Sequence, residues 1–353
     1  MSYIFVSDLH IKPASSYRKT LLTGDAFYAL DQIQEYALEH KVTAMILGGD
    51  VYDSNQPPGE SINRMAEFIR VLNDAKVMVY YIEGNHDRVH RNPYLPEEYY
   101  SEHRLLSSIG AKPLTSCSID GAVFRGIDYC QGDKLKEQLE VLEECDVLCL
   151  HTGFRHLLGF EDAYDITKED IPEAVKRMVL VGHIHVQNSS TTAKGVAVHS
   201  SGSTWVWRVD EADKEHGFLH FGTGDPFTPT FVPLDVRRYF DIDCEQDIID
   251  TMEECHALPP VLRYSRDVLP ALDHSDYPRV RLIAMSGDKD VEEALDAAEE
   301  YAADLLEALI IAVPPDVFPD LYALLKALLE SQDPAEFLQQ YLIEKDVTLK
   351  ETV

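Results

Sequence analysis

The feature that most constrains this chain is an apolar run, residues 77–82, that leads through Glu83 into Gly84-Asn85-His86-Asp87. The run is typical of a buried strand, whereas the segment after it carries an amide, an imidazole and a carboxylate. Such groups side by side are poorly suited to a protein core, because each would need a polar partner there. The sequence therefore predicts a functional site at the place where this strand ends and a loop begins.

The same arrangement recurs along the chain. Four further apolar runs end in aspartate or histidine: residues 3–6 before Asp8 and His10, 42–47 before Asp50, 146–150 before His151, and 178–181 before His183 and His185. The spacing of apolar residues predicts amphipathic helices at 23–40 and 61–72, between the first three strands. This order of strands and helices predicts an α/β fold in which the strand ends build one site.

The rest of the chain predicts further elements and two smaller units. We expect a loop and helix at 93–109, a strand at 122–127 and a helix at 135–142, and β-like segments at 196–200, 217–221 and 228–234 that complete a second sheet. A change of composition near Arg237 divides the chain into a main domain at 1–236, a small α+β unit at 237–288 and a helical region at 289–353. The small unit is expected to contain a helix at 247–256 and a strand at 278–284.

The composition restricts the class of protein and of partner. A net charge of -31 repels phosphate backbones, so a polyanionic substrate would depend on bound cations and local basic patches. No apolar stretch reaches the roughly 18 residues of a membrane span, and the N-terminus lacks a signal-peptide pattern. We therefore expect a cytoplasmic protein with no membrane contact. The six cysteines include no C-x-x-C pair and are expected to be reduced thiols.

The residues at the strand ends form a donor set for metal ions. The set combines oxygen and imidazole groups without thiolates: Asp8, His10, Asp50, Asn85, His151, His183 and His185. Such ligands suit manganese, iron or zinc rather than calcium. Seven groups are too many for one tetrahedral ion, but they suit two ions about 3.5–4 Å apart. Asp50 is the best bridge between them, and Asp8 and His10, two residues apart, are expected to share one face of a strand.

Two residues beside the donor set are candidates for catalysis. A pair of divalent ions polarises a phosphoryl oxygen and lowers the pKa of a bound water toward neutrality. The leaving oxygen then needs a proton donor or a positive charge, and His86 is placed for this role. Asp87 is expected to orient His86 and raise its basicity.

The ordered set of D-x-H, G-D-x-x-D, G-N-H-D, a strand-end histidine and G-H-x-H resembles the calcineurin-like metallophosphoesterase superfamily over residues 1 to about 221. The resemblance implies two facing mixed β-sheets flanked by helices, with a binuclear metal centre at the sheet edge. By motif position, Asp8, His10, Asp50 and His185 would hold one metal, and Asp50, Asn85, His151 and His183 the other. His86 would be the catalytic histidine.

The neighbourhood of the motifs favours one branch of the superfamily. Ser54 and Asn55 follow Asp53 where protein phosphatases have arginine and glycine, and a diester needs less charge neutralisation than a monoester. Residues 50–58 and 214–218 look like the corresponding segments of SbcD-type nucleases, which process DNA double-strand breaks. Ser201 departs from the proline usual in that branch. Asp53 stands where some relatives have a histidine tied to exonuclease action.

The branch resemblance implies a set of partners. They are two Mn²⁺ ions, double-stranded DNA ends, a second copy of the chain, and an SbcC-type SMC-like ATPase that would dock on the C-terminal helices. Arg88 and Arg91, directly after the catalytic motif, are the candidate contacts to the DNA backbone.

The preferred hypothesis is a two-metal DNA exo- and endonuclease, the nuclease subunit of an ATP-dependent SbcCD-like complex for double-strand-break repair and recombination. One alternative is a stand-alone metallophosphodiesterase acting on nucleotides or small diesters. A second alternative is a non-catalytic DNA-end scaffold, which the intact donor set disfavours.

Overall fold

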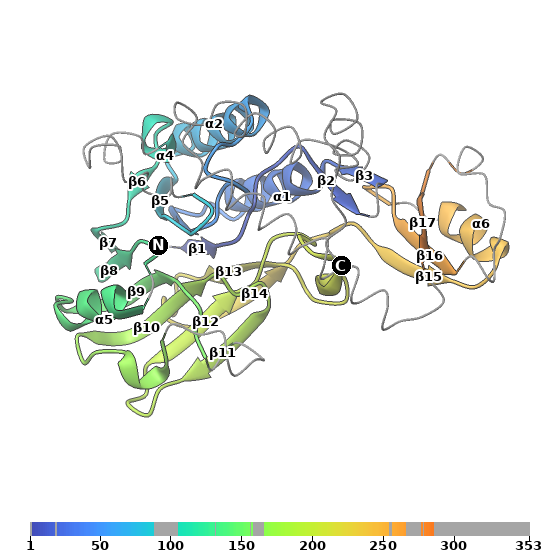
Figure 1. Cartoon of the computed structure of the whole chain (residues 1–353). Helices are drawn as coiled ribbons and strands as arrows, with labels where there is room; N and C mark the ends of the chain where they lie inside the picture. Colours follow the sequence, from blue (N-terminus) through green and yellow to red (C-terminus); the bar gives the residue numbers. More distant parts are fainter. Residues whose placement is uncertain are drawn as a thin grey trace, which may run out of the picture.

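The computed structural model describes residues 2–17, 20–87, 105–130, 132–155, 157, 166–253, 256–265, 277 and 279–285 (Figure 1). Arg88, Arg91 and the predicted C-terminal helical region at 289–353 lie outside the described residues. The chain forms two six-stranded sheets, one three-stranded sheet and one two-stranded hairpin within this part.

The first large sheet has the strand order β14-β13-β1-β4-β5-β6. Its strands are β1 (Tyr3–Val6), β4 (Ala44–Gly48), β5 (Met78–Ile82), β6 (Lys112–Pro113), β13 (Gly217–Phe221) and β14 (Pro229–Pro233). The first four run parallel, and β13 and β14 are antiparallel additions at the edge next to β1. Helices α1 (Asp25–Glu39) and α2 (Gly59–Asp74) confirm the two predicted amphipathic helices, and α4 (Leu105–Ser108) is a single turn.

The second large sheet has the strand order β11-β12-β10-β9-β8-β7. Its strands are β7 (Ser116–Ile119), β8 (Ala122–Ile127), β9 (Cys145–His151), β10 (Val175–Gly182), β11 (Gln187–Thr191) and β12 (Ala197–Ser201). The central strands β8, β9, β10 and β12 are parallel, and the two outer strands are antiparallel. Helix α5 (Gly132–Glu140) and the short 3-10 turn η1 (Lys168–Asp170) belong to this half.

The two large sheets face each other across a shared core. Phe5 and Ile46 of the first sheet lie in one cluster with Val147 and Leu180 of the second. The alternate side chains turn outward: Val6 faces the cluster that contains α1 and α2 residues. Successive residues of a strand point to opposite faces, so a strand that is covered on both faces must be apolar throughout. The predicted fold of two facing mixed sheets flanked by helices is confirmed.

One prediction about the second sheet is wrong. The segments at 217–221 and 228–234 were expected to join it, but β13 pairs with β1, with Tyr3 opposite Phe221, and β14 pairs with β13. Hydrophobic content cannot assign a strand to one sheet or the other when both sheets bury both faces. Phe218 faces the helices and Leu219 faces the second sheet, so β13 serves both layers.

The third sheet is a separate parallel unit of β15 (Tyr239–Ile242), β16 (Val261–Ser265) and β17 (Arg281–Met285), with helix α6 (Glu245–Glu253) on one face. Only α6 and the last strand were predicted. The hairpin of β2 (Ala14–Tyr17) and β3 (Thr20–Thr23) lies beside this sheet (Figure 1). Tyr17 and Leu22 of the hairpin pack against Val261 and Ile283, so the small sheet has a core on each side.

A buried ion pair joins the small sheet to α1. Arg237, only 3% exposed, donates from Nε to Asp25 Oδ1 at 2.7 Å and from Nη2 to Asp25 Oδ2 at 2.9 Å. Its guanidinium also donates to the carbonyl oxygens of Thr23 and Pro259 at 2.8 and 2.5 Å. One side chain therefore ties together the start of α1, the hairpin and the segment before β16.

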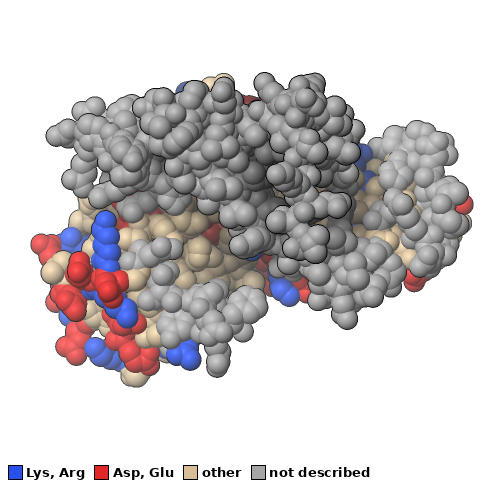
Figure 2. All heavy atoms as spheres, in the orientation of Figure 1, with Lys and Arg blue, Asp and Glu red and all other residues tan. Residues whose placement is uncertain are grey.

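The visible surface carries charges of both signs. Figure 2 shows acidic and basic side chains intermixed over the lobe that contains α5 and β10. Ion pairs such as Lys176 with Glu144 at 3.1 Å and Lys194 with Glu173 at 3.4 Å contribute to this pattern. None of the described helices has the length and hydrophobicity that crossing a bilayer requires.

Candidate metal centre

The parallel strands of both large sheets deliver their carboxyl ends to one place. The loop after β1 lies against the loop after β4, because Asp8 N donates to Gly49 O at 3.1 Å and His10 N donates to Asp50 O at 3.0 Å. The second sheet closes the site. Its strands β9 and β10 end side by side, with His151 at the end of β9 paired with Gly182 at the end of β10. All seven predicted donors lie in this group: Asp8, His10, Asp50, Asn85, His151, His183 and His185.

The backbone of the site is strained. Asp8, His10, Asp50 and His183 have positive φ angles of 54°, 41°, 50° and 79°. This left-handed region is uncommon for residues other than glycine, and it costs about 1–3 kcal/mol each at such positions. The chain therefore leaves the extended conformation as it enters the site. The expectation that Asp8 and His10 share one face of a strand is wrong: both follow the strand, and the turn of the loop brings them together.

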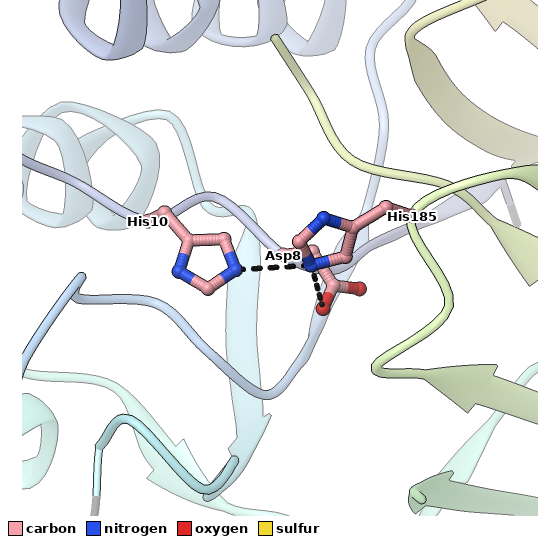
Figure 3. A group of neighbouring side chains, drawn as sticks. All are labelled: Asp8, His10 and His185. Atoms are coloured by element: carbon pink, nitrogen blue, oxygen red, sulfur yellow. Dashed lines mark hydrogen bonds and ion pairs between the residues drawn. The ribbon is translucent and has the colours of Figure 1, made fainter. Parts of the chain in front are cut away.

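The first donor group consists of Asp8, His10 and His185 (Figure 3). The Nε2 atoms of His10 and His185 are 3.2 Å apart, and His185 Nε2 is 3.5 Å from Asp8 Oδ1. Asp8 and His10 are fully buried. Asp8 also accepts the backbone N–H of His183 on both carboxylate oxygens, at 3.0 and 3.1 Å, which fixes its side chain.

The second donor group surrounds Asn85. Its Oδ1 is 3.1 Å from both His151 Nε2 and His183 Nδ1. Asp50 Oδ2 is 3.1 Å from the same His151 nitrogen and 3.8 Å from His10 Nε2 in the first group. One carboxylate oxygen therefore lies between the two groups, the position in which a bridging ligand is needed.

Close backbone approach makes glycine necessary beside these ligands. A Cβ on Gly84 would collide with the carboxylate and backbone of Asp50. A Cβ on Gly182 would overlap Gly48 O and approach His151 Nδ1 to 2.7 Å. Gly84 thus allows the loops after β4 and β5 to meet, and Gly182 allows β10 of the second sheet to approach β4 of the first.

His86 lies at the edge of the first donor group. Its ring is perpendicular to that of His10 at a centroid distance of 4.8 Å, and its Nδ1 is 2.7 Å from the carbonyl oxygen of Asp53. Its backbone N–H donates to Asp50 Oδ1 at 2.9 Å. With Nδ1–H donating to a carbonyl, Nε2 is the ring nitrogen that remains for chemistry.

Asp87 differs from its predicted role. Its carboxylate accepts the backbone N–H groups of Tyr52 at 3.0 Å, Gly84 at 3.0 Å and Val51 at 3.2 Å, and the ring of His86 is oriented instead by Asp53. A hydrogen bond from a backbone N–H to a carboxylate is stronger than one between neutral groups, so these three amides hold the carboxylate in place. Asp87 therefore ties the loop after β4 to the loop after β5.

Burial and neighbouring charges shift the pKa values of the donors in opposite directions. Burial alone would raise the pKa of Asp50, but the rings of His151 and His10 hold it well below its ordinary value. Burial lowers the pKa of His10, and burial with the adjacent His151 lowers that of His183 to about 4. Burial disfavours the charged form of His151 as well, but Asp50 raises its pKa to about 9. Of these four groups, His151 is the one whose pKa favours the protonated form at neutral pH, so a cation that binds its ring would release that proton.

The residues present fit a divalent ion in each donor group. Two ligands at right angles, each about 2.1 Å from one ion, lie about 3 Å apart, and the donor pairs within both groups show separations of this size. Among the described residues, the candidate metal-binding groups of three or more side chains all lie in this centre.

Three neighbours of the donors were not predicted as site residues. Trp207 stacks on His10 at a centroid distance of 4.4 Å and donates from Nε1 to Asp53 Oδ1 at 2.6 Å. Lys12 Nζ is 3.0 Å from the same oxygen, and Glu211 Oε1 is 2.6 Å from His185 Nδ1. A tryptophan and a glutamate about twenty residues after the last ligand carry no motif, so only the fold reveals them.

Comparisons with known proteins agree with this geometry. Residues 1–199 match the family model described as calcineurin-like phosphoesterase. The chain is 24% identical over 265 residues to the DNA double-strand break repair protein Mre11 of Sulfolobus acidocaldarius, a match that covers 71% of this chain and 68% of that protein.

A second relative aligns over a greater length. The protein of the same description from Methanococcus maripaludis is 25% identical over 376 residues, which is 94% of this chain and 96% of that protein. The crystal structure of a dimetal phosphatase from Danio rerio is 11% identical, with a TM-score of 0.42, and covers 62% of this chain and 91% of that chain.

Proposed function

Because the chain belongs to the calcineurin-like phosphoesterase family, we propose that it is a two-metal nuclease that hydrolyses phosphodiester bonds at DNA ends. The observation that carries the proposal is the position of Asp50 Oδ2 between the two donor groups, beside an intact set of ligands. The relatives that match the chain are DNA double-strand break repair proteins. The family is one of phosphoesterases, and this chain has candidate groups for metal ions.

We propose that each donor group holds one ion. Asp8, His10 and His185 would bind the first together with Asp50, and Asn85, His151 and His183 would bind the second with the same Asp50. Mn²⁺ is the proposed native metal, since mixed oxygen and imidazole ligands suit it. When bound, two such ions polarise the phosphoryl oxygens and activate the attacking water.

His86 serves the leaving group in this proposal. The Asp53 carbonyl fixes Nδ1, so Nε2 of the imidazolium form can give its proton to the departing oxygen. Asp87 contributes by holding the backbone around Tyr52 and Gly84 in the conformation that presents Asn85 and His86. Arg88 and Arg91 remain predicted contacts to the DNA backbone.

The assembly is also part of the proposal. We infer a cytoplasmic homodimer that works with an SbcC-type, SMC-like ATPase in repair and recombination. The relatives' description as DNA double-strand break repair proteins supports the role in repair. The division into a nuclease domain at 1–236, a capping domain at 237–288 and an ATPase-docking region at 289–353 belongs to this inference.

The function is tested by supplying purified protein with Mn²⁺ and two substrates, end-labelled duplex DNA and bis-p-nitrophenyl phosphate. We expect cleavage of both, and His86→Ala should lower turnover by about 10²–10⁴-fold, the usual contribution of a general acid. His40→Ala, at an exposed histidine after α1, is the matched control and should retain activity.

The outcomes separate the alternatives. Cleavage of the small diester without cleavage of DNA would favour a stand-alone phosphodiesterase. If the protein cleaves neither substrate but still binds DNA, the result would favour the non-catalytic DNA-end scaffold. Full turnover by His86→Ala would remove the proposed role of this histidine.

A further inference from the structure

Glu211 has no counterpart among the motif residues, yet it touches a candidate ligand. We propose that Glu211 is a positioning residue that holds the His185 ring so that Nε2 is directed into the first donor group. The inference rests on the proposed metal site, but it concerns binding of the ion rather than cleavage of DNA.

The contact is short and directional. Glu211 Oε1 is 2.6 Å from His185 Nδ1, and the opposite ring nitrogen, Nε2, faces His10 Nε2 at 3.2 Å and Asp8 Oδ1 at 3.5 Å. An imidazole that donates Nδ1–H to a carboxylate keeps its lone pair on Nε2, where a metal can use it. The carboxylate also makes the ring a better electron donor.

Glu211 is itself held in place. Its side chain is 8% exposed, and its Oε2 accepts the backbone N–H groups of Trp207 at 3.2 Å and Arg208 at 3.3 Å. Its carbonyl oxygen is 3.1 Å from His216 Nε2, whose Nδ1 contacts Ser203 Oγ at 3.0 Å. A buried carboxylate is costly unless its oxygens are paired, and here both carboxylate oxygens have partners. The contact of the carbonyl oxygen with His216 holds the backbone of the same residue.

The turn that carries Glu211 is anchored from outside the metal centre. It is the 3-10 turn η2 (Val209–Glu211), and Val209 packs on the cluster formed by Tyr17, Val261 and Ile283. The hairpin and the small sheet therefore support the element that orients His185. This connects the third sheet to the first donor group through two residues of one turn.

The test is titration of metal-free protein with Mn²⁺, followed by calorimetry and by electron paramagnetic resonance of the bound ion. Wild-type protein should bind two ions. Glu211→Gln should lower the affinity for one of the two ions by about 10–100-fold and leave the affinity for the other unchanged. This is the effect typical of removing a carboxylate behind a histidine ligand. One amide cannot accept hydrogen bonds from both the ring and the two backbone N–H groups.

Asp213→Asn is the matched control, because Asp213 is a carboxylate of the same loop that pairs with Lys214 at 2.9 Å away from the donors. It should bind both ions as wild type does. Glu211→Asp, which keeps the charge but shortens the reach, should give an intermediate affinity and serves if Glu211→Gln does not fold.

Unchanged binding of both ions by Glu211→Gln would overturn the proposal, as would an equal loss at both sites, which indicates a general structural role. Wild-type protein that binds two Mn²⁺ ions but does not cleave DNA would contradict the proposed function and leave the role of Glu211 intact.

Discussion

Parallel strands build two very different regions in this molecule. In the first large sheet, β1, β4 and β5 run parallel and end beside Asp8, Asp50 and Asn85. In the small sheet, β15, β16 and β17 also run parallel, with α6 over one face and the hairpin over the other. Among the described residues, the candidate metal-binding groups include side chains from the first of these regions and none from the second.

The difference lies in what faces each sheet. The first large sheet meets a second sheet that supplies His151, His183 and His185 from its own strand ends. Within the described part of the chain, the small sheet packs on α6, the hairpin and Val209 of η2. A parallel sheet thus creates an edge where side chains can gather, but an ion needs ligands from several directions. Two facing sheets supply them.

The largest expected effect tests how firmly the two regions are joined. Arg237→Met leaves the carboxylate of Asp25, 7% exposed, buried without its partner, and should lower the free energy of unfolding by about 3–5 kcal/mol. Urea denaturation measures the change. Arg238→Met, at an exposed side chain 3.5 Å from Asp235, should cost no more than about 1 kcal/mol. Equal effects from both variants would mean that the regions are held together elsewhere.

The next-largest effect distinguishes the candidate metal centre from the small sheet. Asp50→Ala removes the oxygen shared by both donor groups and should lower turnover on bis-p-nitrophenyl phosphate by at least about 10²–10³-fold, because charge stabilisation is lost. Leu262→Ala creates a cavity in the small sheet and should lower the free energy of unfolding by about 2–5 kcal/mol with little change in turnover. A comparable loss of turnover in Leu262→Ala would show that the small sheet takes part in the chemistry.

Metal removal should destabilise the first region selectively. Adding Mn²⁺ at a free concentration 100 times its Kd should raise the free energy of unfolding by about 2.7 kcal/mol for each ion bound, because the ions bind the folded chain. Thermal unfolding with and without chelator gives the shift, and Asp50→Ala should show little of it. A Tm that is insensitive to metal would argue against ions in the two donor groups.

The smallest effect concerns the approach to the site. Lys12 is 3.0 Å from Asp53 Oδ1 and lies over the Trp207 ring at 5.7 Å, beside the first donor group. If its ammonium contacts a DNA phosphate, Lys12→Gln should reduce the salt dependence of DNA binding by about one unit of slope. Lys41→Gln, at an exposed residue after α1, is the control. Identical slopes for Lys12→Gln and wild type would mean that Lys12 does not contact DNA and serves only in its ion pair with Asp53.

Much of the fold follows from local patterns in the sequence. Uninterrupted apolar runs and helical spacing predict β1, β4, β5, α1 and α2, because apolar residues cover both faces of those strands and one face of those helices. The strands β2, β15 and β16 were not predicted, since each mixes polar with apolar residues and therefore lacks an uninterrupted apolar run. Sheet membership of β13 was also beyond the sequence, because its pairing with β1 spans more than two hundred residues.

The sequence by itself determined which side chains take part in the centre, since the D-x-H, G-N-H-D and G-H-x-H motifs place aspartate, asparagine and histidine directly after buried strands. Only the tertiary structure decided how they are oriented. The left-handed backbone at Asp8 and His10, the contact of Asp87 with loop amides and the carboxylate of Glu211 behind His185 all depend on segments distant in the chain. Local sequence patterns indicate the residue types and the strand ends. The hydrogen-bond partners of these side chains depend on how distant segments pack together in the folded chain.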